Sequence, residues 1–344
     1  MQLPREVLVG SGTLESISDI SRRLGFTESA LIIAGSKTND VAGKTVKNIL
    51  EKEGVQVNTF IVESATVKDV AAVEEKIKTI KPQVVFGVGG GTKIDIAKLS
   101  SANQGIPFIS VPTTASHDGI ASPLSSIKGY EKPYSIMAQA PIAIIADTEI
   151  IMQAPWRLAI SGCGDVNAKF TAVRDWRLAH KDRNEYYGGY AASLALMSAK
   201  LVMHDAEKIK SKSEEGLRIL LEALISCGVA MSIAGSSRPC SGSEHLFSHA
   251  LDIVKPNHSL HGERCGVGTI LMSYLHGANW KQTQKTLEKL GAPTNAKELH
   301  VDDENLAKAL EIAATLRPDR YTILNKLNLN HDSCEKIAKA TQVI

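Results

Sequence analysis

The amino-acid sequence predicts an α/β domain with a mostly parallel sheet, followed by an all-helical domain. In the first half, short β-branched runs alternate strictly with amphipathic stretches, which is typical of βαβ units. After about residue 150 the apolar residues recur at helical spacing instead. With 344 residues, the chain is longer than one ordinary domain. We therefore expect a Rossmann-like α/β domain over residues 1–152 and an all-α domain over residues 153–344.

The individual elements follow from short apolar runs and from the residues that interrupt them. The predicted strands are residues 30–35, 57–62, 84–91 (ending in a turn), 107–114 and 142–147. Helices are predicted at residues 41–54, 67–81 and 92–105 and, in the second half, within 157–181, 186–210, 213–235 and onward to Ile344. No Pro- or Gly-rich linker separates the halves, so we expect a tight junction with the active site in the cleft between the two domains.

Composition excludes several classes of function. The formal net charge is only +2, which gives no strong attraction to nucleic acid or to a membrane surface. The N-terminal stretch does not resemble a secretory signal, and apolar runs such as residues 141–146 are too short to span a bilayer. The five cysteines are scattered and form no C-x-x-C pair. We expect a cytoplasmic protein with no nucleic-acid partner and no stable membrane insertion.

A glycine-rich turn lies between a predicted strand and a predicted helix in GVGGGTKIDIAK (87–98). Glycine lets the backbone approach a pyrophosphate closely, and the amide groups at the helix start attract the negative charge. The spacing matches neither G-x-G-x-x-G nor a Walker A loop, and a tight turn without a ligand is the alternative. A second loop, VPTTASHDGIASP (111–123), follows the next predicted strand, where ligands bind in open α/β sheets. Together the two loops favour nucleotide binding.

Two histidines, His245 and His249, are four residues apart on a predicted helix and so share one face. His261 precedes a Gly-rich turn into the next helix, and Asp165 starts a helix after a Gly-Cys-Gly turn. Histidine nitrogens and a carboxylate are ligands of catalytic zinc, which keeps one position open for substrate. Any one of these residues alone is ordinary, and Asp165 fits an N-cap equally well. Their combination indicates a metal site, if the fold brings them together.

The stretches GVGGGTKIDIAK, SVPTTASHDGIASP, SGCGDVNAKFTAVRDW and RPCSGSEHLFSHALD with LHGER resemble the archaeal glycerol-1-phosphate dehydrogenases. That family is grouped with glycerol dehydrogenase, iron-dependent alcohol dehydrogenases and dehydroquinate synthase. The resemblance runs from the N-terminus to at least residue 270. The glycine turn is shared by nearly all the group, whereas TTASHDGIASP and SRPCSGSEHLFSHALD are its most discriminating stretches.

The resemblance implies a role for each matching residue. It implies that Asp165, His245 and His261 hold a zinc ion, Zn2+, and that the catalytic and substrate-binding residues are Asp118, His249 and the ligand Asp165. It implies that the dinucleotide, NAD(H) or NADP(H), is bound by Gly89, Gly90, Gly91, Thr92, Lys93, Ile94, Asp95, Thr113, Thr114, Ala115 and Ser116, with Ser122 nearby. Lys169 stands where iron-type alcohol dehydrogenases have a histidine, which favours the two-His, one-Asp zinc arrangement.

The implied activity is the reduction of dihydroxyacetone phosphate to sn-glycerol 1-phosphate, the first step toward the glycerol backbone of archaeal phospholipids, in a homo-oligomer. Hydride would pass from the nicotinamide to C2, and His249 or a water held by Asp118 would donate the proton. Lys169, Arg238 and Lys255 are unranked candidates for binding the substrate phosphate.

The choice of cofactor can be argued from residues 35–37, Gly-Ser-Lys, which lie at the end of the predicted strand over residues 30–35. An acidic residue there would bind the ribose hydroxyls and repel a 2′-phosphate. Its absence predicts that NADPH is accepted alongside NADH. Three alternatives stay open: a glycerol or alcohol dehydrogenase for an unphosphorylated substrate, a dehydroquinate-synthase-like lyase, and a non-catalytic nucleotide-binding protein.

Overall fold

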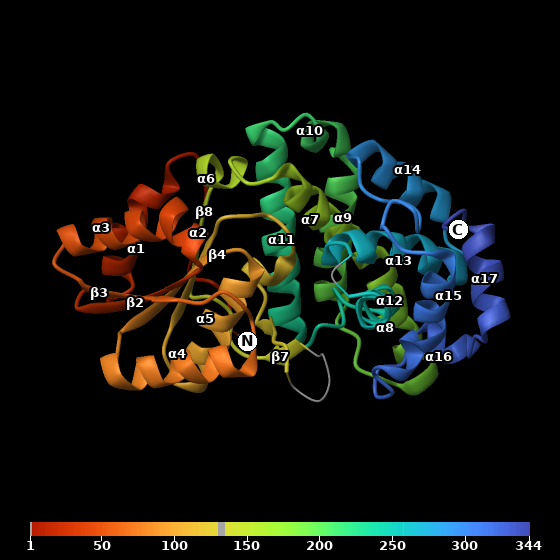
Figure 1. The fold of residues 1–344 in the computed structure, drawn as a ribbon, viewed down its shortest axis with the longest axis horizontal. Coiled ribbons are helices and arrows are strands. Elements are labelled where there is room, and N and C mark those ends of the chain that lie inside the picture. The colour runs from red at the N-terminus through yellow and green to blue at the C-terminus, as the bar shows by residue number, and fades with distance from the viewer. Residues whose placement is uncertain (1, 130–134, 257) are drawn as a thin grey trace. The chain divides into compact units, whose positions relative to one another are not determined.

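A computed structural model describes residues 2–129, 135–256 and 258–344. The chain divides into two compact units, Met1–Trp156 and Arg157–Ile344. The first is an α/β unit, and in the second all regular elements of the described residues are helical, as predicted (Figure 1). The units divide four residues after the expected boundary at residue 152.

The first unit is built on a six-stranded parallel sheet with the order β1-β8-β5-β4-β2-β3. The five predicted strands are all present, and the sequence analysis missed β1 at one edge and a separate antiparallel pair, β6 and β7. The strands are β1 (Glu6–Gly10), β2 (Ser29–Ala34), β3 (Gln56–Ile61), β4 (Val84–Gly89), β5 (Phe108–Pro112), β6 (Leu124–Ser126), β7 (Ser135–Met137) and β8 (Ala143–Asp147).

Helices cover both faces of this sheet, because its central strands are apolar on both sides. On one face, Ile32 and Phe86 pack in a core with residues of α1 and α3, such as Ile17 and Leu50. The opposite face contacts α5, which packs on β4 and β5 and against α4. The helices are η1 (Thr13–Ser16), α1 (Ile17–Arg23), α2 (Ser36–Thr38), η2 (Asn39–Gly43), α3 (Lys44–Lys52), α4 (Val67–Ile80), α5 (Gly91–Asn103), η3 (Asp118–Ile120) and α6 (Thr148–Met152).

Local signals explain where these helices begin and end. Thr66 and Asp69 form a capping box at the start of α4, with each side chain bonded to the other's backbone amide. At its end, Lys81 is left-handed (φ 53°) and directly precedes Pro82, which cannot continue a helix. The predicted single helix over residues 41–54 is instead a helical run that begins at Ser36 and includes a π-helical turn, η2.

The second unit is a bundle of helices, of which α11 is the longest. The helices are α7 (Trp156–Asn167), α8 (Lys169–Arg183), α9 (Gly189–His204), α10 (Ala206–Lys210), α11 (Glu214–Ala234), α12 (Ser243–Val254), α13 (His261–Leu275), α14 (Trp280–Leu290), α15 (Asp303–Ile312), η4 (Ala313–Thr315), α16 (Ile323–Leu327) and α17 (His331–Ala340). By length and composition α11 could cross a membrane, which the sequence analysis did not anticipate. Most of its apolar window is buried against the protein, so its apolar character is accounted for by the core of this unit.

Candidate active site

Four side chains of the second unit converge in one place: Asp165 of α7, His245 of α12, and His261 and Cys265 of α13. Each offers one ligand atom, and these atoms all lie within 4.8 Å of one another. Asp165 and Cys265 are buried, and His245 is only 8% exposed. The three residues predicted to hold a metal are therefore brought together from separate helices, and Cys265 is a fourth member that the sequence analysis overlooked.

Glycines allow α7 and α13 to approach closely enough for this convergence. A Cβ at Gly164 would lie 2.1 Å from the carbonyl oxygen of Gly262, and a Cβ at Gly262 would lie 1.8 Å from that of Ser161. The expected Gly-Cys-Gly turn before Asp165 is wrong, because these residues lie inside α7 and Asp165 is near the end of that helix. The Gly-rich run after His261 is also helical, so it is no turn. These glycines serve helix packing.

Glu244 fixes the orientation of the His245 ring. Its Oε1 lies 2.8 Å from His245 Nδ1, which leaves Nε2 directed at Asp165, 3.4 Å from Oδ1. Glu244 is itself fully buried and accepts hydrogen bonds from the Gly242 amide and the Thr171 hydroxyl. A carboxylate behind a ligating histidine is a common support in metal sites because it sets the ring's tautomer and direction. This role of Glu244 was not predicted from the sequence.

Lys169 lies beside the carboxylate of Asp165. Its Nζ donates a hydrogen bond to Oδ1 at 2.9 Å, and neither side chain is more than 1% exposed. Burial acts to raise the pKa of Asp165, but the charge of Lys169 and the neighbouring His245 outweigh it and hold that pKa well below its usual range. The carboxylate is thus ionised and suited to a cation.

His249, one helical turn beyond His245, borders the same cluster, with its ring centroid 6.0 Å from that of His261. Burial, with the charges on His245 and Arg264, lowers the pKa of His249 to about 3. The imidazole is therefore neutral near pH 7. In this form it can hydrogen-bond a substrate, but it is poorly suited to act as a general acid. Arg317 also contributes to this lowering.

The three cations considered for a phosphate are differently placed. Lys169 donates a hydrogen bond to Asp165. Arg238 is 5% exposed and pairs with Glu185 through two hydrogen bonds, while a third goes to the carbonyl of Tyr321. Lys255 is exposed just after α12. The arginines that influence His249 are instead Arg264 and Arg317, which the sequence analysis did not consider.

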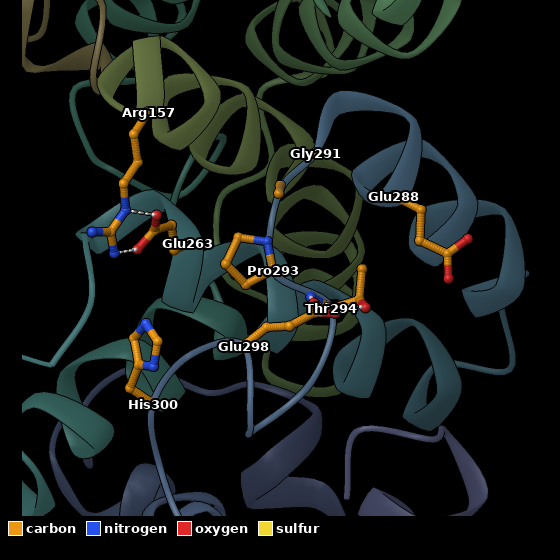
Figure 2. Close-up of a pocket in the computed structure, with 9 residues that line it drawn as sticks. Arg157, Glu263, Glu288, Gly291, Pro293, Thr294, Glu298 and His300 are labelled. Carbon is orange, nitrogen blue, oxygen red and sulfur yellow. Dashed lines mark hydrogen bonds and ion pairs between the residues drawn. The ribbon is translucent and has the colours of Figure 1, made fainter. Parts of the chain in front are cut away.

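A hollow of about 540 Å³ in the second unit adjoins the start of α13 (Figure 2). On its wall, the guanidinium of Arg157 faces the carboxylate of Glu263 in a two-bond pair, with Nε–Oε1 at 2.6 Å and Nη2–Oε2 at 2.8 Å. Glu263 also accepts the Leu260 amide and so caps α13, whose first residue is His261. The pair therefore holds the helix end that carries a candidate metal ligand.

In the first unit, the glycine-rich turn follows β4 and forms the start of α5. Gly89 has φ +153°, and a Cβ there would lie 2.9 Å from Lys93 Cβ. A Cβ at Gly91 would collide with the ring of His117, 1.8 Å from Nε2. The loop after β5 packs directly on this turn, since the Thr113 amide donates to the carbonyl of Gly89. The N-terminal amides of α5, a 13-residue helix that begins just after the carboxyl end of β4, fit the phosphates of a dinucleotide.

The residues implied to bind this dinucleotide differ in exposure. Thr92 is exposed, and four are partly exposed: Gly90, Lys93, Thr114 and Ser116. The buried ones are Gly89, Gly91, Ile94, Asp95, Thr113, Ala115 and Ser122. Of these, the carboxylate of Asp95 has structural partners: Lys98 at 3.2 Å and the Ser126 amide at 3.0 Å.

Lys98 ties the loop that carries Asp118 to α5. Its buried Nζ donates to the carbonyl oxygens of Gly119, at 2.8 Å, and Leu124, at 2.7 Å. Burial lowers the pKa of Lys98, and Asp95 works against that lowering. Asp118 begins η3 in this loop and is partly exposed, and it lies in the first unit, whereas the metal-ligand cluster lies entirely in the second.

An acidic side chain does lie beside residues 35–37, but it follows the neighbouring strand, β3. Glu63, just after β3, accepts hydrogen bonds from the amide of Ser36, at 3.0 Å, and from its hydroxyl. These bonds lower the pKa of Glu63, an exposed residue. Within the described residues its Oε2 has no hydrogen bond. This carboxylate is not apparent from the residues directly after β2, because it reaches Ser36 from the end of the paired strand β3.

Comparisons with known proteins agree with this arrangement. Residues 8–155 match the iron-containing alcohol dehydrogenase family. The chain is 53% identical to the glycerol-1-phosphate dehydrogenase (NAD(P)+) of Methanosarcina mazei, over 100% of this chain and 96% of that protein. The protein of the same name from Pyrococcus furiosus is also 53% identical, over 100% of this chain and 99% of its own. The chain belongs to the glycerol-1-phosphate dehydrogenase family.

The fold is shared beyond that family. The crystal structure of glycerol dehydrogenase from Schizosaccharomyces pombe matches 99% of this chain and 90% of its own, with a TM-score of 0.83 and 23% identity. The resemblance stated from sequence motifs is thereby confirmed at the level of family and fold. This chain thus has the fold of glycerol dehydrogenase, and its helical unit carries the cluster of Asp165, His245 and His261.

Proposed function

We propose that this protein is an NAD(P)-dependent glycerol-1-phosphate dehydrogenase that interconverts dihydroxyacetone phosphate and sn-glycerol 1-phosphate. The observation that carries this proposal is the convergence of Asp165, His245 and His261 in a chain about half identical, over its full length, to proteins of that name. The product would supply the glycerol backbone of archaeal phospholipids. We place the enzyme in the cytoplasm as a homo-oligomer, a dimer or larger.

The metal we propose is zinc, held by Asp165, His245 and His261. Nitrogen and carboxylate ligands from three helices suit this ion, and Glu244 supports one of the imidazoles. When bound, the ion would act as a Lewis acid toward the substrate oxygens. Asp165 brings the negative charge that attracts the cation, and Lys169 keeps that carboxylate ionised in the buried site.

The nucleotide would bind at the carboxyl ends of β2, β4 and β5, with its phosphates at the amides of α5. The three strands are adjacent in the sheet, and the loops after β4 and β5 are hydrogen-bonded to each other. Hydride from the reduced nicotinamide would go to C2 of the ketone, and His249 would hydrogen-bond the substrate as a neutral imidazole. The proton donor would then be a water held by Asp118 rather than His249.

The substrate phosphate would lie near His249, bound by Arg264 and Arg317. Burial is the main cause of the low pKa of His249, and both guanidinium groups add to it, whereas Asp252, which pairs with Arg264 at 3.5 Å, opposes it. The Arg317 side chain is 23% exposed, and Arg264 is held by Ser248 and by the carbonyl of Ser259. Arginine offers paired N–H donors that match a phosphate dianion.

The test is a comparison of dihydroxyacetone phosphate with dihydroxyacetone, followed by the absorbance of reduced nicotinamide, before and after removal of metal by a chelator. We expect rapid turnover of the phosphorylated ketone only, lost on chelation and restored by zinc. Equal rates on both ketones would favour a glycerol dehydrogenase activity instead. Release of inorganic phosphate without net consumption of NADH would indicate a dehydroquinate-synthase-like lyase.

A further inference from the structure

The thiol of Cys265 belongs to the same cluster as the three proposed zinc ligands. His261 and Cys265 are four residues apart at the start of α13, so both side chains lie on one face of that helix. The sulfur lies 3.5 Å from His261 Nε2 and within 4.8 Å of the ligand atoms of Asp165 and His245. Cys265 is completely buried.

The separations between these atoms match those of a tetrahedral zinc site. Bonds of about 2.05 Å to nitrogen and about 2.3 Å to sulfur, at a tetrahedral angle, place the two ligand atoms about 3.5 Å apart. His261 Nε2 and Cys265 Sγ show this separation. The same calculation for a nitrogen and a carboxylate oxygen gives about 3.4 Å, and His245 Nε2 and Asp165 Oδ1 lie 3.4 Å apart. A hydrogen bond between the Cys265 thiol and the His261 imidazole would explain the first distance alone. It would not explain why the ligand atoms of Asp165 and His245 lie within 4.8 Å of the same sulfur.

We propose that Cys265 is a fourth protein ligand of the metal in the resting enzyme. This inference deepens the proposed metal site and rests on it. A thiolate is a soft ligand that favours zinc over iron(II), magnesium or manganese, whereas one carboxylate and two imidazoles accept several of these ions. The chain would thus select zinc although its first unit matches a family described as iron-containing.

A further consequence concerns access to the metal. Catalytic zinc sites keep one position open, whereas four protein ligands fill a tetrahedral site. The Cys265 sulfur would therefore leave the metal, or the coordination would expand to five, when substrate binds. In either case the sulfur–metal contact differs between the resting and the substrate-bound enzyme, and this difference is measurable by spectroscopy.

The experiment uses cobalt(II) in place of zinc in the full-length protein. Wild type should show visible cobalt bands together with a near-ultraviolet sulfur-to-cobalt charge-transfer band. Cys265→Ser should keep the visible bands and lose the near-ultraviolet one. The matched control is Cys334→Ser, which removes a buried thiol of α17 that lies outside the cluster, and this variant should keep both.

The outcomes separate this inference from the proposed function. A near-ultraviolet band that persists in Cys265→Ser, or is missing from wild type that shows the visible bands, would refute the thiol ligand and leave the three-ligand site intact. Absence of all cobalt bands from wild type would refute the metal site itself. X-ray absorption of the zinc-loaded wild type gives an answer that needs no variant: we expect one sulfur at about 2.3 Å, and a shell of nitrogen and oxygen alone would overturn the inference.

Discussion

Lys169 Nζ lies 2.9 Å from Asp165 Oδ1, and the two buried side chains are separated by one helical turn across the junction of α7 and α8. In the metal-free protein this ammonium is the main counter-charge of the carboxylate. A bound metal ion would share the Asp165 carboxylate with Lys169. The carboxylate is therefore next to a positive charge both with and without the metal.

Replacing Lys169 with Met should destabilise the metal-free protein more than the zinc-loaded protein. Removing one partner of a buried ion pair typically costs about 3–5 kcal/mol, because it leaves the other charge uncompensated. Bound zinc would compensate the charge of Asp165 in place of Lys169. The increase in melting temperature on adding zinc should therefore be larger in Lys169→Met than in wild type. Lys200→Met, at an exposed position of α9, is the control. An equal zinc-induced increase in both proteins would contradict this prediction.

Removal of the metal should separate nucleotide binding from turnover. The glycine-rich turn and the loop after β5 belong entirely to the first unit, and the metal-ligand cluster to the second. We expect a chelated enzyme to bind NADH with an unchanged dissociation constant, measured by nicotinamide fluorescence, while turnover of dihydroxyacetone phosphate is lost. Loss of NADH binding on chelation would show that the metal is needed to assemble the nucleotide site.

Replacing Glu244 with Gln should weaken zinc binding without removing a ligand. Supporting residues of this kind typically change metal affinity by roughly 10- to 100-fold, because the imidazole loses its fixed tautomer and orientation. Competition with a chromophoric chelator measures the effect. Glu222→Gln, on the exposed side of α11, should bind zinc like wild type. An unchanged affinity in Glu244→Gln would mean that packing alone orients His245.

Replacing Glu63 with Gln should shift the preference between cofactors toward NADPH. The carboxylate next to Ser36 would repel a 2′-phosphate and accept a ribose hydroxyl, and the nearby cations Lys37 and Lys93 would offset it in the wild type. We expect the dissociation constant for NADPH to fall and that for NADH to rise. Lys37→Ala should change the preference in the opposite direction.

The pH dependence of this preference also follows. The Ser36 hydrogen bonds lower the pKa of Glu63, so the carboxylate becomes protonated only at a pH below its ordinary titration range. Its effect on NADPH should therefore be constant between about pH 7.5 and about pH 9, where the 2′-phosphate, with a second pKa of about 6, is also fully ionised. A preference that changed within this range in wild type but not in Glu63→Gln would show that Glu63 titrates there and would contradict the assignment.

Replacing Arg317 with Gln should impair the use of the phosphorylated substrate specifically. A charge-assisted hydrogen bond contributes about 1.5–3 kcal/mol, so we expect a rise of about 10-fold or more in KM for dihydroxyacetone phosphate. The slow reaction with dihydroxyacetone, which lacks the phosphate, should be unaffected. Arg218→Gln, at an exposed position of α11, is the control. An equal loss on both ketones would assign Arg317 a structural role.

Periodicity and the residues that interrupt it were sufficient to predict five of the six strands of the large sheet and the helical second half. Each of these elements is coded locally, by a β-branched run or by a helical repeat bounded by Gly or Pro. β1 was missed because it is short and none of its five residues is fully buried, which leaves a weak apolar pattern. The glycines of α7 and α13 were misread as turns because local sequence does not reveal a neighbouring helix.

The sequence by itself determined the types of chemistry available: carboxylate, imidazole and thiol groups, and a glycine turn at a strand end. Only the tertiary structure decided which groups meet, because Asp165, His245 and Cys265 are far apart in the chain and are brought together by helix packing. The same applies to Glu63, which reaches Ser36 only because β2 and β3 are paired in the sheet. Side-chain distances of a few ångströms are set by packing between elements, and packing is not encoded in any single stretch.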